Sequence, residues 1–264
     1  MLNYLRDLVK HTSGLDMDVL KITGDDDGNI QIEGMDTEKS IVLKGKFNKE
    51  IPELNGVCGL GNLTWLNGYV NLYQEKADDV SIVRKDQTYS IEVKNPDGST
   101  VTGPNGSTAY EDITENMIEE LHFVRKSPRV KNSYRVVDRR MIPDQYNFVG
   151  ADWDVVVKPT KQAIDMLAQQ AAIGFESSFG VKTEDDVLFL TFGDDGLLGE
   201  MEFANDVDGE LSKPWIWDIG KVLTILKFAD QAECTMSFLD KGALQITLNT
   251  GLGEYNYIMP AKAR

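Results

Sequence analysis

The residue types that most often carry out chemistry are few in this sequence, and they are not grouped at useful spacings. Neither His11 nor His122 has a second histidine or a cysteine at the spacing of a metal site. Cys58 and Cys234 lie far apart, which indicates buried small side chains in a reducing compartment instead of a disulfide framework. We therefore expect no metal, no cofactor and no catalytic residue, and a protein that is not an enzyme.

Two acidic segments with glycines, GDDDGN at 24–29 and GDDGLL at 193–198, resemble calcium-binding loops at first sight. If Gly28 takes the sixth position of such a loop, Thr23 takes the first and Gly34 the twelfth, where the pattern requires acids. Hairpin turns explain both segments better. The glycines of GVCGLGN run in the reverse order of the dinucleotide fingerprint, and no phosphate-binding G-K-[ST] is present.

The stretch RKSPRVKNSYRVVDRR, residues 125–140, gathers positive charge in an acidic chain. It holds seven of the 27 basic residues and one acid, a net of +6. The whole chain carries −16, so everything outside the stretch sums to −22. Such an excess of acids argues against indiscriminate binding to nucleic acid. It leaves room for a protein whose cations are confined to one concave face.

Hydrophobic periodicity indicates an α+β chain in which one order of elements occurs twice. The 264 residues, 41% of them apolar, suit one large domain or two of ordinary size. The spacing of apolar residues predicts helices over 2–12, 54–73, 160–172 and 214–228. Alternation and Asp-Gly turns predict strands over 18–47, 79–85, 88–103, 107–113, 152–159, 175–182, 187–203, 234–250 and 253–260.

Each half therefore reads helix, strands, helix, strands. We predict an N-terminal domain over 1–140, a connector over 141–150 and a C-terminal domain over 151–264. No apolar run approaches the length of a membrane span, and the N-terminus lacks the apolar stretch of a signal peptide. We expect a cytoplasmic protein that does not contact membranes.

Several segments resemble the DNA sliding clamps. The C-terminal CTMSFLDKGALQITLNTGLGEYNYIMPAKAR is similar to the closing strands and tail of these proteins. MIPDQYNFVGADWDVVVKPTKQAIDMLAQQAAIG is similar to their interdomain connector with the strand and helix that follow, and GMDTEKSIVLKGKF to a strand pair of their first domain. DLVKHTSG and LNGVCGLGNLTWLNGY resemble the shorter clamps of tailed bacteriophages. The chain is identified as a clamp of this type, similar to proliferating cell nuclear antigen, ahead of an archaeal or eukaryotic-type clamp.

The resemblance implies an α+β DNA clamp fold, with two similar domains that each pack two helices on antiparallel sheets. Three chains would close head to tail into a homotrimeric ring around double-stranded DNA, with the helices inside and the sheets outside. The ring would tether the replicative DNA polymerase and raise its processivity without reading sequence, after a clamp loader places it on DNA. Edge strands of the two domains would pair across chains. A phage-encoded clamp would work in the host bacterial cytoplasm.

The channel would be lined by long cations and neutral polar groups. Exposed helix faces offer Arg6, Lys10, Lys221 and Lys227 as DNA contacts, with the neutral Asn62, Gln162 and Gln169. Asp165 and Met166 depart from the family, which often has basic residues there. From the basic stretch we favour Arg125, Lys126, Arg129 and Lys131. Its cations guide DNA, pair with acids across a subunit interface, or form a solvated connector; Arg139 and Arg140 could equally serve the interface.

Partner proteins of clamps dock a short peptide with an apolar plug between the connector and the C-terminal tail. By resemblance, this groove would use Met35, Ile41, Ile142, Pro143, Tyr257 and Pro260. The alternative is that Met35, Ile41 and Tyr257 belong to the core and that the two prolines are ordinary loop residues.

Two other classes of function remain open. An acidic two-domain interaction protein, such as a DNA mimic without ring formation, would fit the charge of −16. Its carboxylates should follow one face at phosphate-like intervals, whereas here they cluster in turns. A hydrolase with a scattered carboxylate site has no supporting motif.

Overall fold

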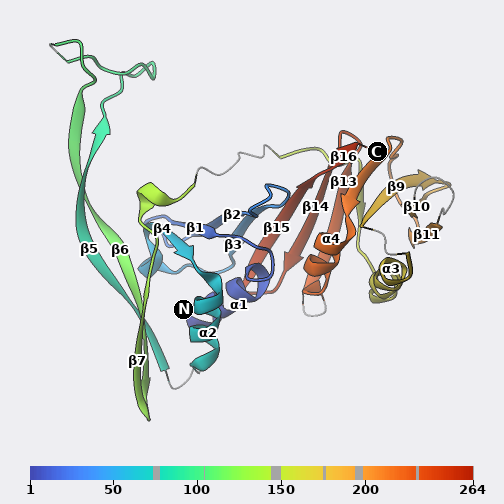
Figure 1. Cartoon of the computed structure of the whole chain (residues 1–264), viewed down its shortest axis with the longest axis horizontal. Coiled ribbons are helices and arrows are strands. Elements are labelled where there is room, and N and C mark those ends of the chain that lie inside the picture. Colours follow the sequence, from blue (N-terminus) through green and yellow to red (C-terminus); the bar gives the residue numbers. More distant parts are fainter. Residues whose placement is uncertain are drawn as a thin grey trace.

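The computed structural model describes residues 1–73, 78–103, 105–143, 150–174, 177–193, 199–229 and 232–263. Figure 1 shows a curved molecule with a broad central sheet, helices along one side and a long two-stranded ribbon at one end. The first half contains α1 (Leu2–Thr12), β1 (Val19–Gly24), β2 (Ile30–Met35), β3 (Val42–Phe47), η1 (Pro52–Leu54), β4 (Gly56–Gly61), α2 (Leu63–Leu72), β5 (Asp78–Glu92), β6 (Tyr110–Lys126), β7 (Arg129–Arg135) and η2 (Arg139–Met141). The second half contains β8 (Val155–Val157), α3 (Lys161–Gly174), β9 (Ser178–Glu184), β10 (Val187–Phe192), β11 (Gly199–Ala204), β12 (Trp215–Asp218), α4 (Ile219–Leu226), β13 (Glu233–Leu239), β14 (Ala243–Asn249), β15 (Gly253–Pro260) and β16 (Lys262–Ala263).

The two halves have the same order of elements and the same strand pairings. The series α1, β1, β2, β3, β4, α2, β5, β6, β7 corresponds to α3, β9, β10, β11, β12, α4, β13, β14, β15. The antiparallel pairs β1–β2, β2–β3, β1–β4, β5–β6 and β6–β7 recur as β9–β10, β10–β11, β9–β12, β13–β14 and β14–β15. The α+β arrangement of two similar domains is therefore confirmed. The bounds of the domains and of the connector stay predictions, because residues 144–149 lie outside the described part.

One eight-stranded sheet joins the halves. Its order is β4-β1-β2-β3-β15-β14-β13-β8, and β3 of the first half pairs with β15 of the second. A five-stranded sheet, β11-β10-β9-β12-β16, and a three-stranded sheet, β5-β6-β7, flank it. We call the β3–β15 pairing the seam. Because the seam continues the ladder of hydrogen bonds from one half into the other, it fixes how the two halves lie relative to each other.

The core lies between this sheet and the helices. Strand alternation turns one row of side chains toward the helices. That row crosses the sheet in register as Gly34, Leu43, Tyr257, Ile246, Met236 and Val157. Leu5, Leu8 and Val9 repeat at helical spacing on α1 and are buried against it, as the sequence predicts.

Two tyrosines of the second half tie the seam to the first helix. The Tyr257 hydroxyl donates to the carbonyl of His11 at 2.9 Å, and the Tyr255 hydroxyl donates to Asp7 Oδ2 at 2.8 Å. Gly45 stands opposite Tyr255 in the seam, and a Cβ there would lie 3.3 Å from the Tyr255 ring and 2.9 Å from a backbone oxygen. Glycine at this position therefore gives the tyrosine ring the room to reach α1.

The helix predicted over 54–73 is wrong in its first half. Residues 56–61 form β4, which pairs with β1, and only Leu63–Leu72 is helical, after Asn62 caps it by accepting from the Trp65 amide. The glycines explain the difference. A Cβ on Gly59 or on Gly61 would lie 2.9 Å from the Val137 side chain, so both positions serve close packing of an extended chain.

The helix predicted over 214–228 is likewise shorter. Residues 215–218 form β12, and α4 begins after Asp218, whose side chain accepts from the Lys221 amide. Trp-Ile-Trp suits a strand better than a helix because aromatic and β-branched side chains pack well on a pleated surface. Pro214 therefore precedes a strand instead of opening a helix.

The acidic segment at 24–29 is a hairpin turn, as predicted. Asp25 accepts from the Asn29 backbone and side chain at 2.8 and 2.9 Å, and Gly28 has a φ of 87°. The second such turn falls on residues 194–198, outside the described part. Cys58 is buried, and burial raises its pKa to about 12, in agreement with a structural thiol. In the described residues, no helix is long and apolar enough to span a membrane.

The buried His11 makes stability depend on pH. Its ring stacks on Tyr255 at 4.9 Å and meets Phe228 at 5.2 Å, and Nε2 has no hydrogen-bond partner in the described structure. Burial lowers the pKa of His11 against the opposing effects of Asp7. The unfolded chain therefore binds a proton at pH values where the folded chain does not, so the free energy of unfolding falls as the pH decreases through about 6.5.

We expect His11→Phe to flatten this dependence. Urea denaturation of the wild type and of His11→Phe at pH 7.5, 6.5 and 5.5 measures it. A His11→Phe slope equal to that of the wild type would show that His11 is not the titrating group.

Candidate nucleic-acid interface

The helices form one surface of the molecule. Figure 1 shows α2, α1, α4 and α3 along the lower side, with the central sheet above them. The helices pack in pairs within each half, α1 with α2 and α3 with α4, and α1 also meets the end of α4 through His11 and Phe228. The residues that face away from the sheets on this side are the candidates for contact with DNA.

This helical surface is depleted of acids. The four helices hold only two of the chain's 43 acidic residues, Asp7 and Asp165, and α2 holds no charged residue. Asp7 is turned inward, because its Oδ2 accepts from Thr250 and Tyr255 at 2.8 Å and its side chain is 11% exposed. The four helices themselves therefore add little repulsion toward a polyanion.

The exposed groups on this side include neutral amides and a few lysines, besides apolar side chains such as Trp65, which is 65% exposed. Asn62, Gln162 and Gln169 are exposed, as predicted from the helical faces, and so are Lys10 and Lys227. Lys161 was missed by the sequence analysis. It lines a groove between α3 and α4 together with Lys227 and Asp165. Its position one residue after Thr160, which caps α3 by accepting from Ala163, is the signal that could have placed it on the first turn.

Among the proposed DNA contacts, Arg6 and Lys221 form bonds within the protein. The Arg6 guanidinium donates to the carbonyls of Val70 and Tyr73 at 2.8 Å each, so it satisfies the carbonyls at the end of α2. The Lys221 ammonium lies 3.0 Å from Asp36 and 2.5 Å from Glu38, and it also donates to Ser40. Lys221 thus holds α4 of the second half to the β2–β3 turn of the first.

The basic stretch forms a hairpin instead of a solvated connector over 125–135. Arg125 donates to the Leu72 carbonyl at the end of α2 and lies 5.5 Å from the Tyr73 ring centroid. Lys126 and Arg129 stand opposite each other at the end of the β6–β7 pair, and both are exposed. Arg125 and Lys126 therefore lie beside the helical side of the molecule.

The remaining cations of the stretch lie along β7 and η2. Arg129, Lys131 and Arg135 are exposed along β7. Arg139 pairs with Glu115 at 2.9 Å and Arg140 with Asp138 at 2.8 Å. In the part of the chain that the structure describes, no strand pairs with the outer edge of β7.

The six residues proposed for the partner groove are not brought together. Ile41 is 1% exposed and Tyr257 is 0% exposed, so both are core residues, which is the alternative named above. Ile142 packs over β4, because a Cβ on Gly59 would lie 3.0 Å from its side chain. In the central sheet, the strands β1, β2 and β3 separate β4 from β15, which carries Tyr257 and Pro260. Met35 is half-buried and Pro143 and Pro260 are exposed.

The outer face of the seam offers a different apolar row. Met35 stands opposite Val42, and Val42 stands opposite Ile258, so the three side chains lie on one face, opposite to Tyr257. Ile258 is 5% exposed, and the other two are half-buried. Val42 and Ile258 are not among the residues predicted from the sequence, although the alternation around Tyr257 could have indicated them.

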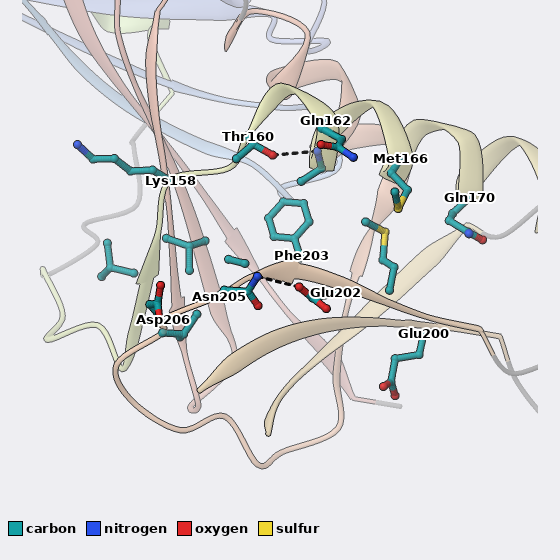
Figure 2. A pocket seen from close by; sticks show the side chains of 16 residues that line it. Lys158, Thr160, Gln162, Met166, Gln170, Glu200, Glu202, Phe203, Asn205 and Asp206 are labelled. Atoms are coloured by element: carbon teal, nitrogen blue, oxygen red, sulfur yellow. Dashed lines mark hydrogen bonds between the residues drawn. The ribbon is translucent and has the colours of Figure 1, made fainter. Parts of the chain in front are cut away.

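A groove lies beside the outer edge of β11, which pairs with no strand among the described residues. Figure 2 shows α3 residues such as Met166 on one side, facing Phe203 and its neighbours on β11. The groove has a volume of about 840 Å³ and includes Glu200, Glu202 and Asp206, against one lysine, Lys158. Its acids suit basic protein side chains better than DNA. In the described residues, no group of His, Cys, Asp and Glu is arranged to hold a metal.

The contrast between Lys221 and Lys227 can be measured. We expect Lys221→Met to lower the free energy of unfolding by about 1–2 kcal/mol, because Asp36 is 4% exposed and loses its cation. The matched variant Lys227→Met should stay within about 0.5 kcal/mol, as exposed substitutions usually do. Urea denaturation of both variants tests this, and equal stabilities would mean that the bonds of Lys221 do not hold the halves together.

No protein-family model matches the chain, and no curated protein matches it. Solved structures match over nearly its whole length. The match to proliferating cell nuclear antigen from Entamoeba histolytica has a TM-score of 0.64 and a sequence identity of 11%, and it covers 99% of this chain and 95% of that chain. The match to the A. fulgidus antigen bound to the C-terminal region of FEN-1 has a TM-score of 0.69 and a sequence identity of 9%, and it covers 100% of this chain and 96% of that chain. The match to the PCNA2–PCNA3 complex from Sulfolobus tokodaii has a TM-score of 0.64 and a sequence identity of 12%, and it covers 100% of this chain and 97% of that chain. The chain therefore has the fold of the DNA sliding clamps.

Proposed function

We propose that the protein is a sliding clamp that encircles duplex DNA and tethers the replicative DNA polymerase, without a chemical activity of its own. The depletion of acids on the helical side carries this proposal. The chain has a net charge of −16, but its four helices carry only two carboxylates, and one of these is turned inward. Such a side tolerates phosphates without binding them tightly. Such a side permits movement along DNA, and closure of a ring supplies the retention.

The internal duplication indicates how the ring closes. Within the chain, β3 pairs with β15 across the seam. Their counterparts in the other halves are β11 and β7, and in the described residues both have an outer edge without a partner strand. If β11 of one chain pairs with β7 of the next, every contact between domains repeats the seam. Such a head-to-tail contact closes a ring when the rotation fits, and three two-domain chains give six domains.

Charge complementarity supports this contact. Arg129, Lys131 and Arg135 are exposed along β7, and Glu200 and Glu202 are exposed along β11. Paired edges would bring the two sets together on one surface. The basic stretch then has two tasks. Its β7 cations serve the subunit interface, and Arg125 and Lys126, beside the end of α2, guide DNA.

Partner proteins would dock on the outer face of the seam. The half-buried Met35 and Val42 and the exposed Pro260, next to the buried Ile258, give an apolar surface on the face opposite to the helices. A polymerase or clamp loader bound there would not obstruct the channel. The likeness to a solved clamp bound to the C-terminal region of FEN-1 supports the binding of a partner protein. A tailed-phage source and a role in the host cytoplasm are part of the same proposal.

Light scattering tests the ring directly. We expect a mass of three times 29.5 kDa over a range of micromolar concentrations. In a primer-extension assay, stimulation of the polymerase should be large on circular templates and lost on short linear templates with open ends, because the ring slides off them. A monomer that stimulates both templates equally contradicts encirclement.

A charge swap tests the interface. Reversing the charge in Lys131→Glu/Arg135→Glu should weaken the trimer on the order of tenfold or more, because like charges then face each other across β7 and β11. Adding Glu200→Lys/Glu202→Lys to the same chain should restore the mass of the trimer, because every interface then joins an acidic β7 to a basic β11. The control Lys49→Glu/Lys241→Glu changes the same charge at exposed turns elsewhere. If the combined substitutions do not restore the mass of the trimer, the interface lies on other strands.

A further inference from the structure

The β5–β6 ribbon continues far beyond the sheet to which it belongs. Its register runs without a break in pairing from Asp78 opposite Arg125 to Glu92 opposite Tyr110, with a shift at Val83/Arg84. β7 pairs only with the part of β6 from Glu120 to Lys126. We call residues 86–116 the arm. Figure 1 shows it rising from the body on the side away from the helices.

The arm is fixed at its root only. The Arg84 guanidinium donates to the carbonyls of Asn116, Glu53 and Asn55 at 3.0, 3.0 and 2.6 Å. Arg139 of η2 donates to Tyr89 and Glu115 at 3.1 and 2.9 Å. Beyond these residues, the hydrogen bonds of the described arm residues join the arm to itself, as in Ser90 with Asp112. A two-stranded ribbon without support is only marginally stable in water. We therefore expect an arm of this length to serve a function.

The two faces of the arm differ. Tyr89 stands opposite Ile113 and Ile91 opposite Glu111, so one face carries Tyr89, Ile91 and Ile113, and Val93 extends it toward the tip. The other face carries pairs such as Thr88 with Thr114 and Ser90 with Asp112. Such alternation is typical of a strand pair with one covered face. In this chain nothing described covers the apolar face beyond Tyr89, and Ile91 is 37% exposed.

The charge of the arm selects the occupant. It contains six acids and one lysine, a net of −5. DNA would be repelled. A second copy is a poor occupant too, because everything outside residues 125–140 sums to −22 and the cations of that stretch lie at β7, η2 and the end of α2. A protein segment with lysine or arginine beside apolar residues matches both the charge and the apolar face.

The position of the apolar face connects it to the proposed partner site. Arg139 reaches both Tyr89 and Glu115, which lie on that face, so the face is turned toward η2. η2 ends at Met141, which is 74% exposed and begins the predicted connector. We propose that the arm is a second docking surface of the clamp, which takes a basic, apolar segment of the partner protein that binds beside the connector. This inference rests on the proposed function.

The first experiment measures the physical preference of the arm with defined probes. A fluorescent octapeptide of alternating lysine and valine is titrated against the full chain, with a peptide of alternating glutamate and valine as the control. In the arm-shortened variant, Asn-Gly replaces residues 86–116 and joins Lys85 to Met117, which already stand opposite each other. Ile91→Lys and Ser90→Lys form a matched pair, because both add the same charge to adjacent positions on opposite faces.

The full chain should bind the lysine-valine peptide and not the glutamate-valine peptide. Binding should weaken at least tenfold in the arm-shortened variant and in Ile91→Lys, and much less in Ser90→Lys. Unchanged binding by the arm-shortened variant would overturn the proposal, since the peptide would then sit on the acidic body. Equal loss in Ile91→Lys and Ser90→Lys would also overturn it, because charge alone would explain the binding.

The second experiment separates the arm from the ring. The arm-shortened variant should keep the trimer mass in light scattering and lose at least half of the polymerase stimulation on circular templates. Loss of the trimer would show that the arm is a contact between copies, which contradicts the proposal. A wild-type chain that is a monomer would instead contradict the proposed function, whatever the peptide binding shows.

Discussion

The pairing of β3 with β15 is the constraint on which the rest of the structure depends. It makes one sheet of strands from both halves, and it brings Tyr255 and Tyr257 of the second half onto α1 of the first. Lys221 adds a charged tie between α4 and the β2–β3 turn. With these contacts the helices of both halves lie on one side of the molecule. A shift of the seam by one residue would turn the tyrosines to the outer face and separate α1 from the second half.

Acidic and basic residues are distributed unevenly over the fold, which the composition alone does not show. Acids are concentrated on the strands and turns, and the helices hold two of 43. Several cations that the sequence places on helix faces are used inside the protein. Arg6 satisfies the end of α2, and Lys221 joins the halves. The side that meets DNA in our proposal is therefore defined more by missing carboxylates than by added lysines, which suits a protein that must not hold DNA tightly.

The sequence predicts the repeated order of helices and strands because apolar periodicity is a local signal. Leu2, Leu5 and Val9 indicate α1, and the Asp-Gly turn indicates the first hairpin. The signal fails at β4, where the spacing of Leu60 and Leu63 looks helical while Gly59 and Gly61 pack against Val137. It also cannot tell which face of β15 is outward, so Tyr257 was assigned to a groove and Ile258 was missed. These choices depend on contacts between residues far apart in the chain.

The outer edges of β7 and β11, which have no partner strand in the described residues, resemble the edges joined in the seam, and this likeness has a consequence for assembly. A chain that offers one edge at each end can add further copies without limit unless the rotation between copies brings the last edge back to the first. A small change in the curvature of the central sheet, for example through the glycines on either side of the seam, would then convert a closed circle into an open spiral. In the proposed assembly, the geometry that joins the two halves would thus also decide whether the copies form a finite particle or a fibre.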